Sequence, residues 1–218
     1  MKVLILGATG RTGKHLLANA LKAGYQVNVL VRDKNKVKIN HPQLTIFEGN
    51  TLDKELLAKA LQDCTYLVSA LNISRTSDFP WAKLRTPENF LSSTLQLILE
   101  LADEKVLKHL VIITAWGVHE TLNHIPFWFK WMIQKSNIGI AYKDHEIQED
   151  LLKKSGLNFT VVRPVVLTNA KIIGNVKVSY NNQPKPSLTI SRKRLAQFII
   201  SILGNKEYFN QLPTLSQA

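Results

Sequence analysis

The most constraining feature of this 218-residue chain is a short apolar run at residues 3–6, VLIL, that leads directly into the glycine loop GATGRTG at residues 7–13. Beyond the loop, apolar residues return at helical spacing on one face: Leu16, Leu17, Ala20 and Leu21. In a strand–loop–helix unit of this kind, Gly7 makes the tight turn, Gly10 lets the backbone approach a pyrophosphate, and Gly13 lets the helix pack on the strand. The helix N-terminus, with free N–H groups and a positive dipole end, then faces the anion. A purely structural turn is the alternative, but the position between a strand and a helix favours a dinucleotide site.

The second expected strand indicates which dinucleotide is bound. Residues 26–31 have the composition of a buried strand, and Arg32 follows them directly. An acidic residue at this position binds the ribose 2′-hydroxyl of NAD, whereas a cation suits the 2′-phosphate of NADP. Arg32 therefore predicts NADP(H) in preference to NAD(H), with Arg11 and either Lys34 or Lys36 as further contacts to the same phosphate. A solvated basic turn is the alternative interpretation.

Strand and helix patterns alternate along the rest of the chain. Strands are expected at residues 44–47, 66–71, 109–114, 159–162, 176–180 and 188–190, and helices at 53–61, 88–102, 140–155 and 191–203. Asp53 and Ser191 are the expected N-caps of two of these helices. The pattern predicts an α/β fold with a Rossmann-like, doubly wound parallel sheet. We expect one domain over residues 1–218, with residues 165–218 forming a small subregion that completes the substrate side.

The carboxyl ends of the strands locate further candidate site residues. Ligands of open parallel sheets lie outside these ends, so adenine and ribose are expected beside residues at or just after the carboxyl ends of the third and fourth strands: Asn50, Thr51, Ala70, Leu71 and Asn72. The segment after the fifth strand, residues 115–135, is unusually aromatic. It is either an amphipathic segment, buried or facing a protein partner, or a wall over the substrate site.

Composition narrows the class of protein. No apolar run reaches the roughly 18 residues of a membrane span, and the N-terminal run is too short for a signal peptide, so no membrane partner is expected. The single cysteine, Cys64, excludes an internal disulfide and suits a reducing compartment, which predicts a cytoplasmic protein. The net charge of +12 favours anionic ligands, but the lysines are spread along the chain, so nucleic acid is not the expected partner. His119 and His124 are five residues apart without cysteine support, so no metal site is expected.

Several stretches together resemble the atypical short-chain dehydrogenase/reductases of the NAD(P)H-binding, NmrA-like kind, and most nearly their biliverdin-IXβ reductase/flavin reductase members. The matching stretches are GATGRTG (7–13), AGYQVNVLVRD (23–33), HLVIIT (109–114), KDHEIQEDLLKKSGL (143–157) and TISRKRLAQFII (189–200). They run through nearly the whole chain in the order that the family has.

This resemblance implies a set of binding residues. NADPH would be bound by Arg32 and the whole glycine loop, namely Gly7, Ala8, Thr9, Gly10, Arg11, Thr12 and Gly13. Asn50, Thr51 and Leu52 would surround the adenine, and Thr114, Ala115 and Pro164 would line the nicotinamide. A flavin or tetrapyrrole-like planar molecule would stack on the nicotinamide. As its walls we place Arg75, Trp116, Trp128 and Trp131.

The chain also departs from the family pattern. The Tyr-x-x-x-Lys pair of the superfamily is absent, because Tyr142 is followed four residues later by Glu146. A serine that is expected after the fifth strand is Ala115, beside Thr114. His145 is then the titratable side chain expected near the reacting carbon, for proton delivery or anion contact. A surface or helix-capping histidine is the alternative.

Two hypotheses of different classes follow. The first is an NADPH-dependent oxidoreductase that passes hydride to a flavin or a related planar acceptor, such as a quinone or a biliverdin-like molecule. The second is a non-catalytic NADP(H)-binding redox sensor that acts through a protein partner docked on the aromatic segment, residues 116–131.

Overall fold

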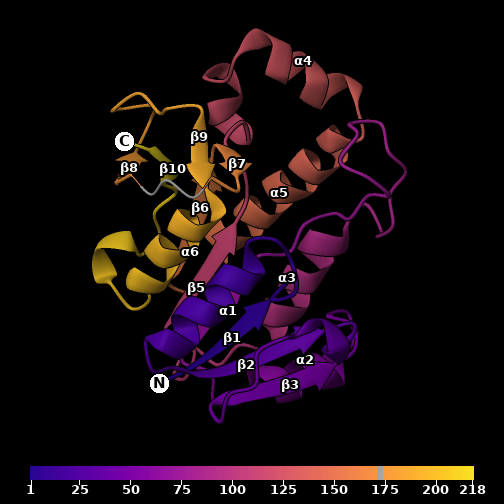
Figure 1. Cartoon of the computed structure of the whole chain (residues 1–218), viewed down its shortest axis with the longest axis vertical. Helices are drawn as coiled ribbons and strands as arrows, with labels where there is room; N and C mark the ends of the chain where they lie inside the picture. Colours follow the sequence, from indigo (N-terminus) through magenta and orange to yellow (C-terminus); the bar gives the residue numbers. More distant parts are fainter. Residues whose placement is uncertain (171–173) are drawn as a thin grey trace.

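The apolar runs and amphipathic helices form a layered α/β fold in a computed structural model, which describes residues 1–170 and 174–218 (Figure 1). The first half of the chain contains β1 (Lys2–Leu6), α1 (Gly13–Lys22), β2 (Gln26–Val31), β3 (Leu44–Glu48), α2 (Lys54–Leu61), β4 (Tyr66–Ser69) and α3 (Phe90–Leu101). The second half contains β5 (His109–Ile113), α4 (Phe127–Lys135), α5 (Ile138–Lys153), β6 (Phe159–Pro164), β7 (Val166–Thr168), β8 (Val176–Ser179), β9 (Thr189–Ser191), α6 (Arg192–Ser201) and β10 (Thr214–Gln217).

Eight of the described strands form one sheet in the order β3-β2-β1-β4-β5-β6-β10-β8. All neighbours from β3 to β10 are parallel, and β8 runs antiparallel to β10. The chain winds outward from β1 to β3 on one side and from β4 to β6 on the other, so the strand order reverses between β1 and β4. The prediction of a Rossmann-like, doubly wound sheet is confirmed, and this reversal point is where such folds bind ligands.

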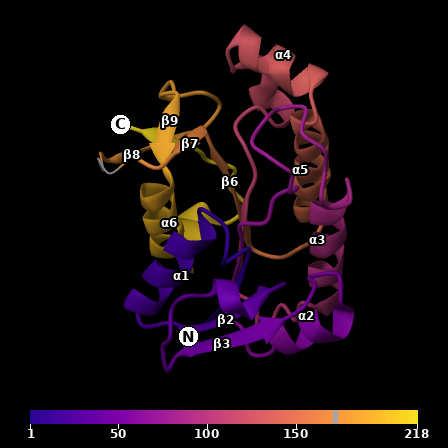
Figure 2. The ribbon, with the colours of Figure 1, turned by 45° about the vertical axis from the view of Figure 1, so that its right-hand side comes forward.

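Helices cover both faces of the sheet (Figure 2). Successive side chains of a strand point to opposite faces, so Val3 and Ile5 pack against α1 and α6, while Leu4 and Leu6 pack against α2, α3 and α5. Strands that are buried on both faces appear as continuous apolar runs, which is why β1 and β5 could be located from the sequence. In the part of the chain that the structure describes, no helix has the length and apolarity needed to cross a membrane.

The predicted helix caps are confirmed. The Asp53 carboxylate accepts a hydrogen bond from the Leu56 N–H at the start of α2, and the Ser191 hydroxyl accepts one from the Arg194 N–H at the start of α6. The start of α3 was predicted at residue 88 but lies at Phe90. Its first-turn N–H groups donate to the Asp144 carboxylate, which comes from α5 and is remote in sequence.

Two strands were missed. β7 pairs with β9 in a small second sheet, and β10 extends the main sheet beside β6. Both are short, and their pairing partners lie far away in the sequence, so no local pattern marks them. The segment at 115–135 contains a 3₁₀ turn, His119–Asn123, and then α4.

Candidate functional site

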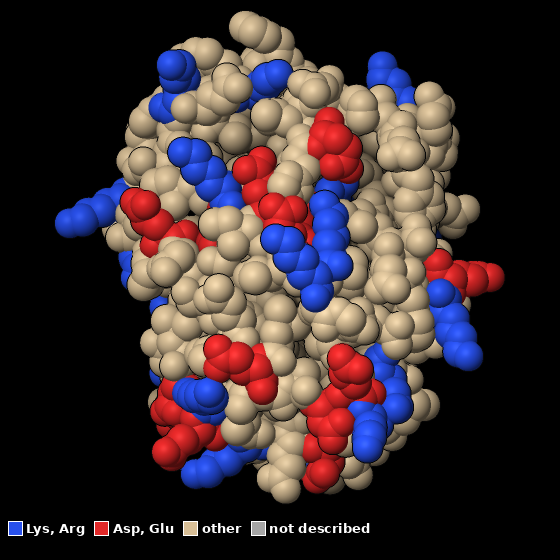
Figure 3. Space-filling view, turned by 180° about the vertical axis from the view of Figure 1, so that it is seen from behind, with Lys and Arg blue, Asp and Glu red and all other residues tan. Residues whose placement is uncertain are grey.

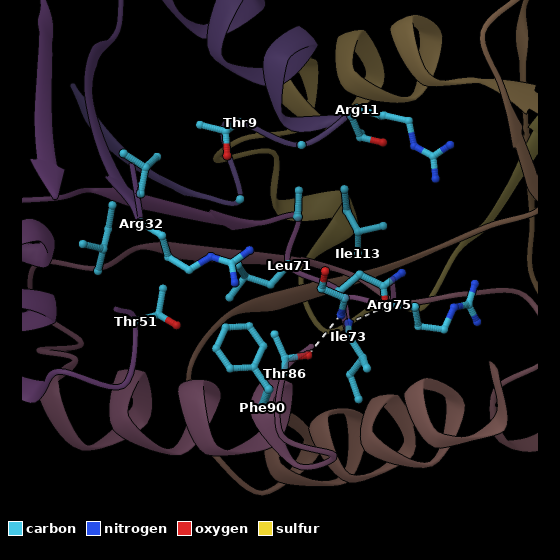
Figure 4. Close-up of a pocket in the computed structure, with 18 of the residues that line it drawn as sticks. Thr9, Arg11, Arg32, Thr51, Leu71, Ile73, Arg75, Thr86, Phe90 and Ile113 are labelled. Atoms are coloured by element: carbon cyan, nitrogen blue, oxygen red, sulfur yellow. Dashed lines mark hydrogen bonds between the residues drawn. The ribbon is translucent and has the colours of Figure 1, made fainter. Parts of the chain in front are cut away.

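A cavity of about 620 Å³ opens at the carboxyl edge of the sheet. It is bordered by the segments that follow β1, β2, β3, β4 and β5, and Leu167 and Arg192 close it from the C-terminal part of the chain. Figure 4 shows side chains from these separate segments directed toward one common space. The predicted residues that line the cavity are Gly7, Thr9, Gly10, Arg11, Thr12, Arg32, Asn50, Thr51, Ala70, Leu71, Asn72, Arg75, Thr114 and His145.

The glycine loop has the geometry of a phosphate cradle. Gly7 has a φ of +78°, and a Cβ there would lie 2.7 Å from the Ala70 carbonyl oxygen. A Cβ on Gly13 would lie 2.0 Å from the Gly7 carbonyl oxygen, so only glycine permits this approach of α1 to the loop. Within the described residues, the backbone N–H groups of Arg11, Thr12 and Gly13 have no hydrogen-bond partner. These donors therefore remain available to an anion at the N-terminus of α1.

Arg32 is the cation best placed to bind a phosphate at the end of β2. Its side chain is exposed, extends into the cavity from the side of β2 (Figure 4), and makes no ion pair or hydrogen bond with any described residue. The neighbouring cations are already paired: Lys34 Nζ lies 3.3 Å from Glu48 Oε2, and Lys36 Nζ lies 3.7 Å from Asp33 Oδ2. The structure thus separates Arg32 from the two lysines that the sequence grouped with it.

Arg11 belongs to a different part of the cavity rim. Its Nη1 and Nη2 donate to the Asp78 carboxylate at 3.0 and 2.9 Å, which links the glycine loop to the loop after β4. This bidentate pairing with Arg11 lowers the pKa of the Asp78 carboxyl. Asp78 is the single acid among the lining residues, against four arginines, Arg11, Arg32, Arg75 and Arg192. The cavity therefore has an excess of positive charge, which favours an anionic ligand.

The residues expected around adenine hold their own loops in shape. Asn50 Oδ1 accepts from the Leu52 N–H (3.1 Å), and Asn72 Oδ1 accepts from the Ile73 N–H (2.8 Å). The Thr51 hydroxyl lies 3.0 Å from that of Thr94 on α3. These contacts use the side-chain oxygens internally, while the asparagine amide NH₂ groups stay available on the cavity rim.

Behind Thr114, at the end of β5, lies a buried ionic network. The Thr114 hydroxyl donates to Glu149 Oε1 at 3.0 Å, and Glu149 accepts from Arg163 Nε (3.0 Å) and Nη2 (2.5 Å). Glu149 is fully buried, Arg163 is 2% exposed, and Glu120 pairs with the outer side of the guanidinium. Because the Thr114 proton is directed at Glu149, the hydroxyl oxygen presents lone pairs to the cavity and acts there as an acceptor.

His145 lines the same cavity as a neutral imidazole. Gln148 Nε2 donates to the Leu91 carbonyl (3.2 Å), which turns the Gln148 amide oxygen toward His145 Nδ1 at 3.0 Å. Nδ1 therefore carries the proton, and Nε2 is left as an acceptor. Burial lowers the pKa of His145, although the Gln148 hydrogen bond opposes the shift. The imidazole consequently accepts a hydrogen bond near neutral pH and does not donate a proton from Nε2.

The structure leaves other predicted residues outside the cavity lining, namely Ala8, Gly13, Leu52, Ala115, Pro164, Trp116, Trp128 and Trp131. Trp116 is buried in the core, whereas Trp128 and Trp131 are exposed on α4. The Tyr142 hydroxyl donates to the Trp116 carbonyl at 3.2 Å, and burial raises the pKa of its phenol. Tyr142 is therefore not a candidate acid, as the missing lysine partner already indicated.

Sequence reasoning missed part of the cavity wall. Ile73, Phe90, Ile113 and Leu167 line it with apolar surface, and Arg192 adds a cation. They come from five separate segments, so no local motif collects them. Arg163 did carry a signal, because a charged residue directly after the apolar run at 159–162 requires a buried partner. The identity of that partner, Glu149, could not be deduced from spacing.

Comparison with known proteins finds a family model, a relative and solved structures that are similar to this chain. A family model described as NAD(P)H-binding matches residues 7–206. An uncharacterized chloroplastic protein of Arabidopsis thaliana is 28% identical over 94% of this chain and 73% of its own length. The anaerobillin reductase ChuY of Escherichia coli O157:H7 superimposes with a TM-score of 0.80 over 100% of this chain and 97% of that chain, at 17% identity. A short-chain dehydrogenase/reductase of Veillonella parvula in complex with NADP has a TM-score of 0.79 over 99% of this chain and 94% of that chain, at 16% identity.

Proposed function

Since this chain belongs to the NAD(P)H-binding family, we propose that it is an NADPH-dependent reductase that passes hydride to a flavin or a related planar acceptor, such as a quinone or a biliverdin-like molecule. One observation carries the proposal. A single cavity connects the glycine loop and Arg32 at one end with Thr114 and His145 at the other. The phosphates and the reacting ring of one dinucleotide can therefore be held in the same space.

The residues present fit such a cofactor. The loop of Gly7 to Gly13 leaves backbone donors free among the described residues, and its tight fold depends on glycine because a Cβ on Gly7 or Gly13 would collide with neighbouring backbone. Arg32 would bind the 2′-phosphate, because its guanidinium makes no hydrogen bond or ion pair with the described residues that a phosphate would have to break. When bound, the reduced nicotinamide supplies the hydride, so the protein has to provide position, charge and a dry surface.

At the reacting end, both polar groups act as acceptors. Thr114 donates its proton to Glu149 and His145 Nδ1 donates to Gln148, so the Thr114 oxygen and His145 Nε2 are left as acceptors. We propose that Thr114 and His145 accept hydrogen bonds from donor groups of the ligands, such as an amide NH₂, a ribose hydroxyl or a ring N–H. In this assignment His145 positions a ligand, and the proton that a reduced acceptor takes up comes from water. This replaces the sequence-based expectation that His145 delivers the proton.

The shape and lining of the cavity favour a flat acceptor. Phe90, Ile73, Ile113 and Leu167 provide apolar surface on which a planar ring can stack. Residues 165–218 contribute Leu167 and Arg192, so we propose that this segment completes the substrate side. Holding two rings in contact accounts for most of the acceleration of a hydride transfer. Alcohol or sugar dehydrogenation is not proposed, because the partly buried Tyr142 donates its hydroxyl to the Trp116 carbonyl and has no lysine four residues later.

We place this activity in the reducing cytoplasm. Cys64, the single cysteine, is buried, and burial raises the pKa of its thiol to about 12. Such a thiol is neither a nucleophile nor a redox centre at neutral pH.

The test is a titration followed by a turnover assay. Purified protein is titrated with NADPH and with NADH, and nicotinamide absorbance is then followed after addition of FMN, a water-soluble quinone or biliverdin. The proposal predicts tighter binding of NADPH and loss of the reduced-nicotinamide signal with at least one acceptor. Selective binding without turnover on all three would refute the reductase and favour a redox sensor. Absence of binding would refute both hypotheses.

A further inference from the structure

A group of aromatic side chains is exposed at the end of the molecule that carries α4. Phe127 is 83% exposed, Trp128 60% and Trp131 50%. In the loop after β4, Phe79 is 62% exposed and Trp81 45%. We call these five residues the aromatic rim. Large apolar side chains gathered in this way on a surface mark a contact site, whereas isolated ones do not.

The rim is built from one face of a helix whose other face is already used by the fold. At about 100° per residue, Phe127, Trp128 and Trp131 fall within a single arc of α4. The opposite face holds the buried Ile133 and Phe129, whose ring lies 6.4 Å from that of Tyr142 on α5. α4 is therefore apolar on both sides, and only the inner side is covered within the chain.

The loop and the helix form one continuous surface. The ring centroids of Phe79 and Trp81 are 5.3 Å apart, and those of Trp81 and Trp131 are 6.3 Å apart. Trp81 Nε1 also donates to the Lys135 carbonyl at 2.7 Å, and Asn137 Nδ2 donates to the Trp81 carbonyl at 3.0 Å. These bonds hold the two segments in a defined arrangement, although they lie far apart in the sequence.

Most charged residues in the two segments that carry the rim are basic, and Asp78, directly before Phe79, is paired with Arg11. Residues 79–87 and 121–143 contain no aspartate or glutamate, and their charged residues are Lys83, Arg85, Lys130, Lys135 and Lys143. Figure 3, seen from behind with the α4 end at the top, shows lysine and arginine but no acidic side chain on the uppermost part of that face. A basic, aromatic surface is complementary to one that is acidic and apolar.

We propose that the aromatic rim is a docking surface for an anionic lipid membrane, on which α4 lies without crossing it. Tryptophan and phenylalanine partition into the headgroup boundary, and lysines beside them are attracted to anionic lipids. The five rim side chains are between 45% and 83% exposed, which suits insertion of their rings into a soft lipid surface. The sequence argument against a membrane concerned spanning segments only, whereas an interfacial helix needs no long apolar run.

The chain carries its own reporter for this binding. Three of its four tryptophans, Trp81, Trp128 and Trp131, belong to the rim, and the fourth, Trp116, is buried. With vesicles of phosphatidylcholine and phosphatidylglycerol, tryptophan emission should shift to shorter wavelength and be quenched by lipids brominated on the acyl chains. Vesicles of phosphatidylcholine alone should produce a much smaller change, and added salt should reverse the shift.

Variants separate the apolar and the electrostatic contributions. Phe79→Ser with Phe127→Ser removes the two most exposed rings but keeps every tryptophan, and should abolish co-sedimentation with anionic vesicles. Lys130→Gln and Lys135→Gln should each weaken binding by about fivefold. Val106→Ser, an exposed apolar residue between α3 and β5, is the matched control and should bind as the unmodified chain does. Circular dichroism melts verify that each variant is folded.

Three results would overturn the proposal. The first is no spectral shift with anionic vesicles, and the second is equal binding of the double serine variant. The third is a dimer, detected by light scattering, that the same two serines dissociate, because the rim would then be an interface between two copies of this chain. The assay needs no cofactor, so its outcome is independent of whether the chain is a reductase.

Discussion

Replacing Arg32 by serine should reduce the preference for NADPH over NADH. Arg32 follows β2 directly, extends into the cavity from its exposed position, and pairs with no described residue. Its removal therefore breaks no hydrogen bond or ion pair with a described residue, and the change in the free energy of unfolding should stay within the small range typical of surface substitutions. The effect should appear in binding alone.

The magnitude follows from the contacts that the guanidinium offers to a phosphate. Hydrogen bonds to a charged group contribute about 1.5–3 kcal/mol, and 1.36 kcal/mol corresponds to a tenfold change. Arg32→Ser should therefore weaken NADPH binding by about 10- to 150-fold. NADH has no 2′-phosphate, so its affinity should be unchanged.

Fluorescence titration of reduced nicotinamide provides both dissociation constants for each variant. Lys34→Ser is the matched control, because Lys34 is also an exposed cation near the end of β2 but is paired with Glu48 at 3.3 Å. It should leave the NADPH-to-NADH ratio as it is. An equal loss of both cofactors in Arg32→Ser, or an equal change of the ratio in Lys34→Ser, would refute the assignment of the 2′-phosphate to Arg32.

Three further predictions concern the loop, the buried network and pH. Gly13→Ala should weaken NADPH binding by roughly tenfold or more in calorimetry, because a Cβ lying 2.0 Å from the Gly7 oxygen displaces loop donors worth about 0.5–1.5 kcal/mol each. Glu149→Gln breaks a buried ion pair and should lower the free energy of unfolding by about 3–5 kcal/mol, which is roughly 6–20 °C in melting temperature. It should also raise KM, because the hydrogen bond from Thr114 to the Glu149 carboxylate is lost. A melting temperature lowered by less than about 2 °C would contradict this prediction. Burial lowers the pKa of His109 from 6.5 to about 4, so between these values the unfolded chain binds the extra proton. Stability should therefore fall by about 3 kcal/mol as the pH is lowered from 7 to 4, which urea unfolding would measure, and His109→Asn should lack most of this loss.

Much of the architecture could be predicted because it is encoded locally. The runs of β1, β2 and β5 are apolar on both faces, and the helices between them carry one apolar stripe. The Asp53 and Ser191 caps were identified from sequence because a capping side chain bonds to N–H groups two or three residues away. Where a helix is capped by a remote residue, as Asp144 caps α3, the prediction placed the boundary two residues too early.

In the candidate site, too, some features depend on local sequence and others on contacts between distant segments. The glycine loop and Arg32 could be predicted without the structure, because the loop conformation and the position after β2 depend only on adjacent residues. The fold sets which cations are paired among the described residues, since Arg11 pairs with Asp78 and Lys34 with Glu48 across the fold. The fold likewise leaves Thr114 and His145 as acceptors, because their hydrogen-bond partners, Glu149 and Gln148, take the proton of the hydroxyl and of Nδ1. Which ion pairs form, which buried polar groups meet and which face of α4 stays exposed all depend on contacts between segments far apart in the chain. The local pattern of residues carries no information on which distant segments come together.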